Sequence, residues 1–175
     1  MRFDLYSLIH KAQRKYLFDL SIAIGQANPS DELQCKNIEL RIHKMILHIE
    51  DHSKTEERFI HPLYAEVGHQ DKLLEKAHHD TKDQFERLKY LSIKMDVKEL
   101  YSEYNRFVAN YLEHTDEEEK LQAEILWKHF DDQRLMAAMG EFAASKSSQD
   151  MISALDFMAP ALNIQELMKL FGAKG

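Results

Sequence analysis

One stripe of side chains constrains the fold of this chain more than any other feature. Between positions 38 and 59 its residues recur at steps of four and three, which is the period of one helix face. The stripe consists of Ile38, Ile42, Met45, Ile49, His52, Glu56 and Phe59. It is apolar except for a histidine and a glutamate that stand one helical turn apart. Such a stripe predicts a long helix that turns both polar groups toward the core.

Three other segments carry similar stripes. With the first stripe, they predict four helices over about residues 3–26, 31–61, 70–92 and 97–130. Asp31 is a start signal for the second helix, and Asp96 with Glu99 is one for the fourth, whereas Pro62 and Gly68 break the chain after the second. Short connections between long helices favour antiparallel neighbours. We therefore expect an all-α fold, an antiparallel up-down-up-down four-helix bundle.

The composition agrees with a few long helices and few turns. The 175 residues include only 5 glycines and 3 prolines. We expect the bundle to occupy residues 1–130, and residues 131–175 to form a short C-terminal helical extension packed on it. Within the extension, the sequence predicts a short helix over about 135–142, a flexible linker over 145–149, a stretch capped by Asp150 that ends at Pro160, and a last helix capped by Asn163 and Glu166 and closed by Gly172.

Charge and cysteine content exclude several classes of protein. The net charge is −7, and no cluster of Lys or Arg marks a nucleic-acid partner. No run of 18 apolar residues predicts a membrane span, and the N-terminus has no apolar core of a signal peptide. The single cysteine, Cys35, rules out a disulfide framework within the chain and favours a reducing compartment. We expect a cytoplasmic protein.

Six metal-ligating side chains lie in the apolar stripes, and they are His10, His52, Glu56, His78, His114 and Glu118. A glutamate in a bundle core is costly unless a proton, a charge partner or a metal ion neutralises it. Counted from the predicted turns, the six positions differ in depth by about 6 Å or less, at 1.5 Å per residue. All six side chains can therefore meet in one layer. This pattern predicts a metal site in the core.

The residue types leave the metal and some neighbours open. Histidine with carboxylate suits iron, manganese or zinc. Glu57 and Glu119 each follow a predicted ligand, and they could be surface residues, hydrogen-bond partners of a ligand, or additional ligands. His48 could hydrogen-bond a ligand or face solvent, and His79 lies on a polar face, so His78 is the preferred ligand. The ferritin-like pattern, the zinc-protease motif and a phosphate loop are not matched.

Four motifs resemble those of hemerythrin-like proteins. They are HKAQRKYL at His10, HSKTEERFIHPL at His52 and Glu56, a lone histidine at His78, and HTDEEEKLQ at His114 and Glu118, and they cover about residues 5–130. The tail MAPALNIQELMKLF resembles a segment that ends some bacterial members. The resemblance implies a bundle that holds two iron ions, which Glu56 and Glu118 bridge together with an oxo, hydroxo or water ligand. Zinc and manganese are possible substitutes.

The chain departs from the oxygen-carrying members of that family. Those members place two histidines one turn apart on the third helix, whereas this chain has Leu74 four residues before His78. The second bridge is a glutamate, Glu118, where the carriers use aspartate. Six protein ligands instead of seven would leave a coordination position open to water, dioxygen, nitric oxide or peroxide. Simple reversible oxygen carriage is therefore not the expected function.

Four functions remain open at this point. The resemblance implies a protein that binds or senses small diatomic or peroxide ligands, or an enzyme that reduces peroxide or nitric oxide. An iron-handling or iron-donating protein is a third reading, although the N-terminal cysteine-bearing domain of the cluster-repair branch is not present in this sequence. In the fourth hypothesis, the metal serves only to stabilise the fold. Apolar residues of the extension could then bind a protein partner or a second copy of the chain.

Overall fold

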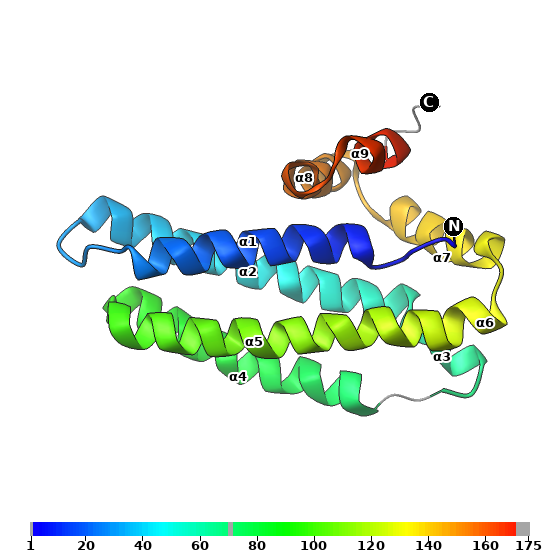
Figure 1. Ribbon diagram of the computed structural model, residues 1–175, viewed down its shortest axis with the longest axis horizontal. Coiled ribbons are helices and arrows are strands. Elements are labelled where there is room, and N and C mark those ends of the chain that lie inside the picture. Colours follow the sequence, from blue (N-terminus) through cyan, green and yellow to red (C-terminus); the bar gives the residue numbers. More distant parts are fainter. Residues whose placement is uncertain (1, 70–71, 171–175) are drawn as a thin grey trace.

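The computed structural model describes the backbone of residues 2–69 and 72–170. It also describes the side chains of these residues, except those of residues 72–80. The described chain is helical and contains no strand, which confirms the predicted all-α class (Figure 1). Four long helices dominate it: α1 Ser7–Gly25, α2 Glu32–Phe59, α4 Lys72–Lys94 and α5 Val97–Leu121. Each contacts two of the others, in the pairs α1–α2, α2–α4, α4–α5 and α5–α1. None of the described helices is both long and apolar enough to cross a membrane.

Local hydrogen bonds set the starts of these helices. The carboxylate of Asp31 accepts from the backbone N–H of Gln34 at 3.0 Å, and that of Asp96 accepts from Glu99 at 3.1 Å, as the two start signals predict. α1 begins at Ser7 instead of residue 3, because the Asp4 carboxylate accepts from the backbone N–H of Tyr6 and Ser7, each at 3.0 Å. The described residues before Ser7 therefore form a non-helical lead-in to α1.

The predicted break at Pro62 is wrong in one respect. The chain continues beyond α2 as the short helix α3, His61–Glu66, with Pro62 in its first turn. A proline is tolerated there, because the first backbone N–H groups of a helix have no partner within it. Gly68, with a φ of 77°, adopts the left-handed conformation that glycine takes without strain.

The fourth helix extends to residue 129, close to the predicted end, but it contains a π-helical turn that the sequence did not predict. α5 ends at Leu121 and is followed by a π-helical turn, η1 Gln122–Leu126, and by α6 Trp127–His129. The Gln122 side chain, buried here, accepts from the backbone N–H of Leu5 at 2.7 Å and donates to Asp4 at 3.2 Å. These contacts join residues more than a hundred positions apart, so helix periodicity could not have revealed them.

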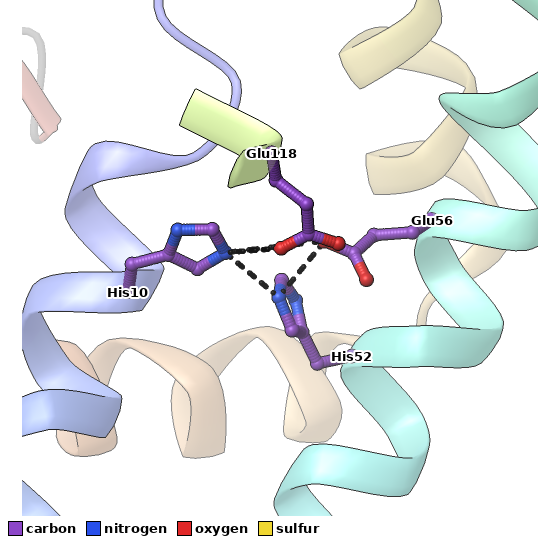
Figure 2. A group of neighbouring side chains, drawn as sticks. All are labelled: His10, His52, Glu56 and Glu118. Atoms are coloured by element: carbon purple, nitrogen blue, oxygen red, sulfur yellow. Dashed lines mark hydrogen bonds and ion pairs between the residues drawn. The ribbon is translucent and has the colours of Figure 1, made fainter. Parts of the chain in front are cut away.

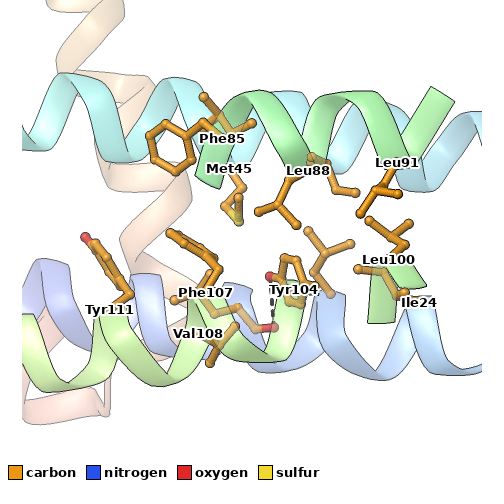
Figure 3. Packing of buried hydrophobic residues seen from close by; sticks show 14 of the residues in the cluster. Ile24, Met45, Phe85, Leu88, Leu91, Leu100, Tyr104, Phe107, Val108 and Tyr111 are labelled. Atoms are coloured by element: carbon orange, nitrogen blue, oxygen red, sulfur yellow. Dashed lines mark hydrogen bonds between the residues drawn. The ribbon is translucent and has the colours of Figure 1, made fainter. Parts of the chain in front are cut away.

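The apolar stripes of the four long helices form the core, as Figure 3 shows for α1, α2, α4 and α5. Leu17, Leu88 and Phe107 are each 1 % exposed. Each such side chain stabilises the fold by about 1.5–3 kcal/mol relative to an exposed position. The hydroxyl of Tyr104 donates to the Leu17 carbonyl at 3.1 Å across α5 and α1. The core thus fixes the relative depth of the helices.

The C-terminal part consists of α7 Asp132–Ser145, α8 Ser148–Met158, η2 Ala159–Ala161 and α9 Ile164–Leu170. α7 contacts α2, and α8 and η2 contact α1. The predicted flexible linker is wrong, since only residues 146–147 lie between α7 and α8. Ser147, not Asp150, is the N-cap of α8, and Asp150 completes a capping box. Asn163 and Glu166 cap α9 as predicted, whereas Gly172 lies outside the described residues.

Candidate metal centre

Side chains from three helices meet in the core, where four of the predicted ligands lie together. His10 comes from α1, His52 and Glu56 from α2, and Glu118 from α5 (Figure 2). Each offers a nitrogen or oxygen atom, and these atoms all lie within 4.8 Å of one another. His10, Glu56 and Glu118 are fully buried. The centre is therefore a convergent set of metal-ligating atoms in an apolar interior.

The histidine Nε2 atoms point at each other and at the carboxylates. Nε2 of His10 lies 3.2 Å from Nε2 of His52, 3.3 Å from Glu118 Oε2 and 3.9 Å from Glu56 Oε1. Nε2 of His52 lies 3.0 Å from Glu56 Oε1. A single N–H can donate to only one or two of these atoms at good geometry. A cation bound among them would satisfy the facing lone pairs together.

Glu118 lies between two imidazoles. Its Oε2 faces His10 of α1, and its Oε1 lies 3.2 Å from Nε2 of His114, one turn earlier on α5. The pair His52 and Glu56 repeats this four-residue spacing on α2, which places both side chains on one helix face. The two oxygens of Glu118 therefore point to different nitrogens, as a carboxylate that joins two metal ions would require. His114 lies beside the four-residue group and is not part of it.

His78, the sixth predicted ligand, lies in a part of the chain whose backbone is described but whose side chains are not. His78 belongs to α4, which packs against α2 and α5. Its side chain lies outside the described part, as do those of His79, Leu74 and Glu75. The structure thus places the side chains of five of the six predicted ligands, and brings four of them within reach of one ion.

Glu119 orients His10. Its Oε1 accepts from Nδ1 of His10 at 2.9 Å, and Arg14 approaches the same oxygen at 2.9 Å. Arg14 also donates to the hydroxyl of Thr115 at 3.1 Å. The hydrogen bond from Nδ1 leaves Nε2 of His10 pointing toward the centre. Of the roles left open for Glu119, the structure thus selects that of hydrogen-bond partner, whereas Glu57 is exposed.

The pKa values show how the centre balances its charge with protons. Burial would lower the pKa of His10, but hydrogen bonds to Glu118, Glu119 and Glu56 raise it to about 10. Burial acts to raise the pKa of Glu56, yet the imidazoles of His52 and His10 hold it below its ordinary value. Burial and Glu56 act to raise the pKa of Glu118, and His10 and His114 hold it below its ordinary value. The buried carboxylates of Glu56 and Glu118 are therefore ionised, and positive charge beside them stabilises this state.

Two tyrosines, Tyr6 and Tyr111, lie beside the centre. The ring of Tyr6 stacks on His10 with centroids 5.2 Å apart. The ring of Tyr111 lies 6.1 Å from that of His114, and its buried hydroxyl has no hydrogen-bond partner among the described residues. Burial, with the charges of Glu56 and Glu118, raises the pKa of Tyr111 well above its ordinary value. A buried, neutral phenol thus lies beside His114. The only sequence signal was its spacing of one turn from His114.

His48 takes neither of the two roles suggested for it. It is half-buried, and its ring stacks on Phe157 of α8 with centroids 4.3 Å apart and planes 19° apart. The ring of Tyr16 lies 5.8 Å from that of Phe157. The C-terminal part of the chain therefore covers the seam between α1 and α2, one turn from His52.

Comparisons of the chain with protein-family models, with curated proteins and with solved structures find no match. The class of site is therefore defined by the donor set alone. Imidazole nitrogens and carboxylate oxygens together bind iron, manganese or zinc. The four grouped donors could hold a metal ion, and Glu118 presents its other oxygen to His114.

Proposed function

We propose that this protein binds a pair of metal ions at His10, His52, Glu56, His78, His114 and Glu118. Iron is the metal that we propose first, for both ions. The observation that carries the proposal is the pair of fully buried glutamates facing imidazole Nε2 atoms from different helices. Without metal, protons shared with the imidazoles compensate the two carboxylates. Metal ions held between the helices would replace these protons and stabilise the native state by binding to it alone.

The arrangement of helices supports a hemerythrin-like bundle. α1, α2, α4 and α5 contact one another in a closed ring, and successive helices reverse direction along the long axis in Figure 1. We infer an antiparallel up-down-up-down four-helix bundle with the metal centre between its helices and a C-terminal extension on one side. Such bundles place ligands from facing helices in one layer.

The function that fits this centre is the binding or sensing of small ligands such as dioxygen, nitric oxide or peroxide. Bound metal ions would supply Lewis acidity and, for iron, electrons. The chain supplies the remaining parts. Glu119 fixes the orientation of His10, and the apolar core excludes bulk water from the ligand atoms. Tyr111 offers a buried phenol that can donate a hydrogen bond to a molecule at the centre.

A di-iron enzyme that reduces peroxide or nitric oxide is the second candidate. The buried hydroxyl of Tyr111, which has no hydrogen-bond partner among the described residues, favours it, because a donor beside His114 could hydrogen-bond a reacting ligand. Reversible binding and turnover use the same ligands, so kinetics must separate them.

Metal analysis of protein purified in air, with its visible absorption, tests the metal and its stoichiometry. We expect two iron ions per chain. Rapid mixing of the reduced, iron-loaded protein with dioxygen, nitric oxide or hydrogen peroxide then tests the ligand: a stable adduct indicates binding or sensing, and repeated turnover indicates an enzyme. A chain that binds no metal when iron, manganese and zinc are all supplied would overturn the proposal.

A further inference from the structure

The C-terminal part of the chain is fastened to both α1 and α2. We call residues 146–170, which include α8, η2 and α9, the strap. At the start of the strap, Nζ of Lys146 lies 2.8 Å from Oδ1 of Asp51 on α2. Near its end, Nζ of Lys11 on α1 donates to Oε2 of Glu166 at 2.8 Å. The strap therefore joins the two helices that carry three of the four grouped donors, His10, His52 and Glu56.

Between these two ion pairs, Phe157 of α8 contacts both helices. Its ring stacks on that of His48 of α2, with centroids 4.3 Å apart and planes 19° apart. Its centroid also lies 5.8 Å from that of the Tyr16 ring on α1. Because one aromatic ring rests on two helices, its fit depends on how far apart they are.

The contacts of the strap lie at the depth of the candidate metal centre. Lys11 follows His10 directly on α1, and Asp51 directly precedes His52 on α2. Neighbours in a helix differ in depth by about 1.5 Å. Lys11 and Asp51 are exposed, whereas His10 is buried. The strap therefore holds α1 and α2 from outside at the level where His10 and His52 point inward.

The donor atoms of the centre bring the same two helices together from inside. Nε2 of His10 on α1 lies 3.2 Å from Nε2 of His52 on α2. If both imidazoles held one ion, α1 and α2 would be tied together at this depth. Binding that rigidifies one part of a protein lowers the cost of ordering a second part that rests on it. An occupied centre would therefore favour a docked strap.

The strap is held weakly enough to respond. None of its described residues is fully buried, and each of its two ion pairs has an exposed partner. Exposed ion pairs stabilise a protein little. Segments with few buried contacts open locally well before the whole protein unfolds. A modest change in the separation of α1 and α2 would therefore be enough to shift the strap between docked and released states.

We propose that the strap is coupled to the metal centre: bound metal favours its docked state, loss of metal favours its release, and Phe157 transmits the change. The inference rests on the proposed function, because it names the way in which the same centre shows its occupancy at the surface. Coupling between two sites is reciprocal. A docked strap therefore strengthens metal binding by the factor by which metal favours docking.

Hydrogen exchange of the full chain, iron-loaded and chelator-treated, tests the coupling. The backbone amides of α8 should exchange at least about fivefold more slowly with iron, the lower end of typical coupling between sites. The turn between α1 and α2, residues 26–31, is an internal control, because it lies at the far end of the long helices (Figure 1). Its amides should exchange at the same rate in both samples.

Phe157→Ala separates transmission from simple attachment. It should speed exchange of α8 in the metal-free protein about two- to tenfold, the effect of one lost aromatic contact. It should also remove most of the slowing by iron, whereas a residue that only attaches the strap would leave that slowing unchanged. Ile152→Ala is the matched control, since Ile152 is an apolar residue of α8 that is 50 % exposed. It should preserve the slowing by iron.

A second variant provides the test if α8 does not form in Phe157→Ala. Lys11→Gln removes the ion pair with Glu166 from the α1 side, so it should speed exchange of the strap and reduce the slowing by iron. Lys15→Gln is its control, because Lys15 pairs with Asp19 of its own helix. It should leave both quantities as in the native protein.

Iron content, measured in the same samples, distinguishes failure of the strap from failure of the metal centre. Two bound ions with unchanged exchange of α8 would overturn the coupling and leave the proposed function standing. Equal slowing by iron in the native protein, Phe157→Ala and Lys11→Gln would overturn the role of these contacts. A chain that binds no metal would overturn the coupling together with the proposed function.

Discussion

Nδ1 of His10 lies 2.9 Å from Oε1 of Glu119, a residue 109 positions further along the chain. This hydrogen bond joins α1 to α5 and directs the other ring nitrogen of His10 toward Glu118 and Glu56. Arg14 approaches the same carboxylate oxygen and limits its movement. The orientation of a predicted metal ligand thus depends on a contact outside the ligand set.

Replacement of Glu119 by Gln should weaken metal binding without abolishing it. A partner that orients a ligand histidine typically contributes about 10–100-fold to metal affinity. The affinity can be measured by competition with a chromophoric chelator. Glu117→Gln, at an exposed position on the same helix, is the control and should leave the affinity unchanged. An unchanged affinity in Glu119→Gln would show that the contact with His10 is not needed to hold the metal.

Replacement of Glu56 or Glu118 by Ala should remove most of the bound metal, because each carboxylate faces imidazoles at the centre. Metal at about a hundred times its dissociation constant stabilises a native protein by about 2.7 kcal/mol. Metal analysis and thermal unfolding with and without iron should therefore show loss of both metal and stabilisation. Glu117→Ala should keep both. Two ions per chain in both glutamate variants would rule out the bridging assignment.

His78 and His79 provide a test of the helix register on α4. The sequence predicts that His78 is a ligand and that His79 lies on a polar face. His78→Ala should lower the metal content, whereas His79→Ala should not. Metal analysis of the two variants, prepared side by side, decides between them, and a larger loss in His79→Ala would mean that the register is wrong by one residue.

The metal-free protein should be most stable in mildly acidic solution. The pKa of His10 is about 10 in the folded protein, whereas its ordinary value is 6.5. The contribution of His10 to stability is therefore complete below pH 6.5 and is lost as the pH rises toward 10. The pKa values of Glu56 and Glu118 lie below the ordinary 4.5, so their contributions are complete above 4.5 and are lost as the pH falls. The free energy of unfolding should therefore be highest between pH 4.5 and pH 6.5.

Urea titrations of chelator-treated protein across that range test this expectation. In Glu118→Gln the decline above pH 6.5 should be smaller, since one of the groups that raises the pKa of His10 is gone. A free energy of unfolding that stays constant from pH 6.5 to pH 10 would contradict the assigned protonation of His10.

The helices and much of the candidate site were predictable from sequence because their signals are local. The steps of three and four along residues 38–59 place His52 and Glu56 on the face that packs against α1 and α4. His114 and Glu118 are paired in the same way on α5. The caps at Asp31 and Asp96 were also readable, since an N-cap interacts with residues only three positions away.

Counting from the turns predicted that the ligands share one depth, but it did not predict the individual contacts that other residues make between distant segments. The π-helical turn at η1 accompanies two hydrogen bonds of the Gln122 side chain, which donates to Asp4 and accepts from the backbone N–H of Leu5. Phe157 of α8 stacks on His48, a residue more than a hundred positions away in the chain. No periodic pattern encodes such a meeting, because it depends on how whole helices pack.

The sequence by itself therefore determined the all-helical class, the extents of most helices and the faces that carry histidine and glutamate, because helix geometry relates neighbours by a fixed rotation per residue. The tertiary structure alone decided that Glu119 orients His10, that Glu118 lies between two imidazoles, and that Phe157 stacks on His48. These relationships arise where packed helices set distances between residues that the chain keeps far apart.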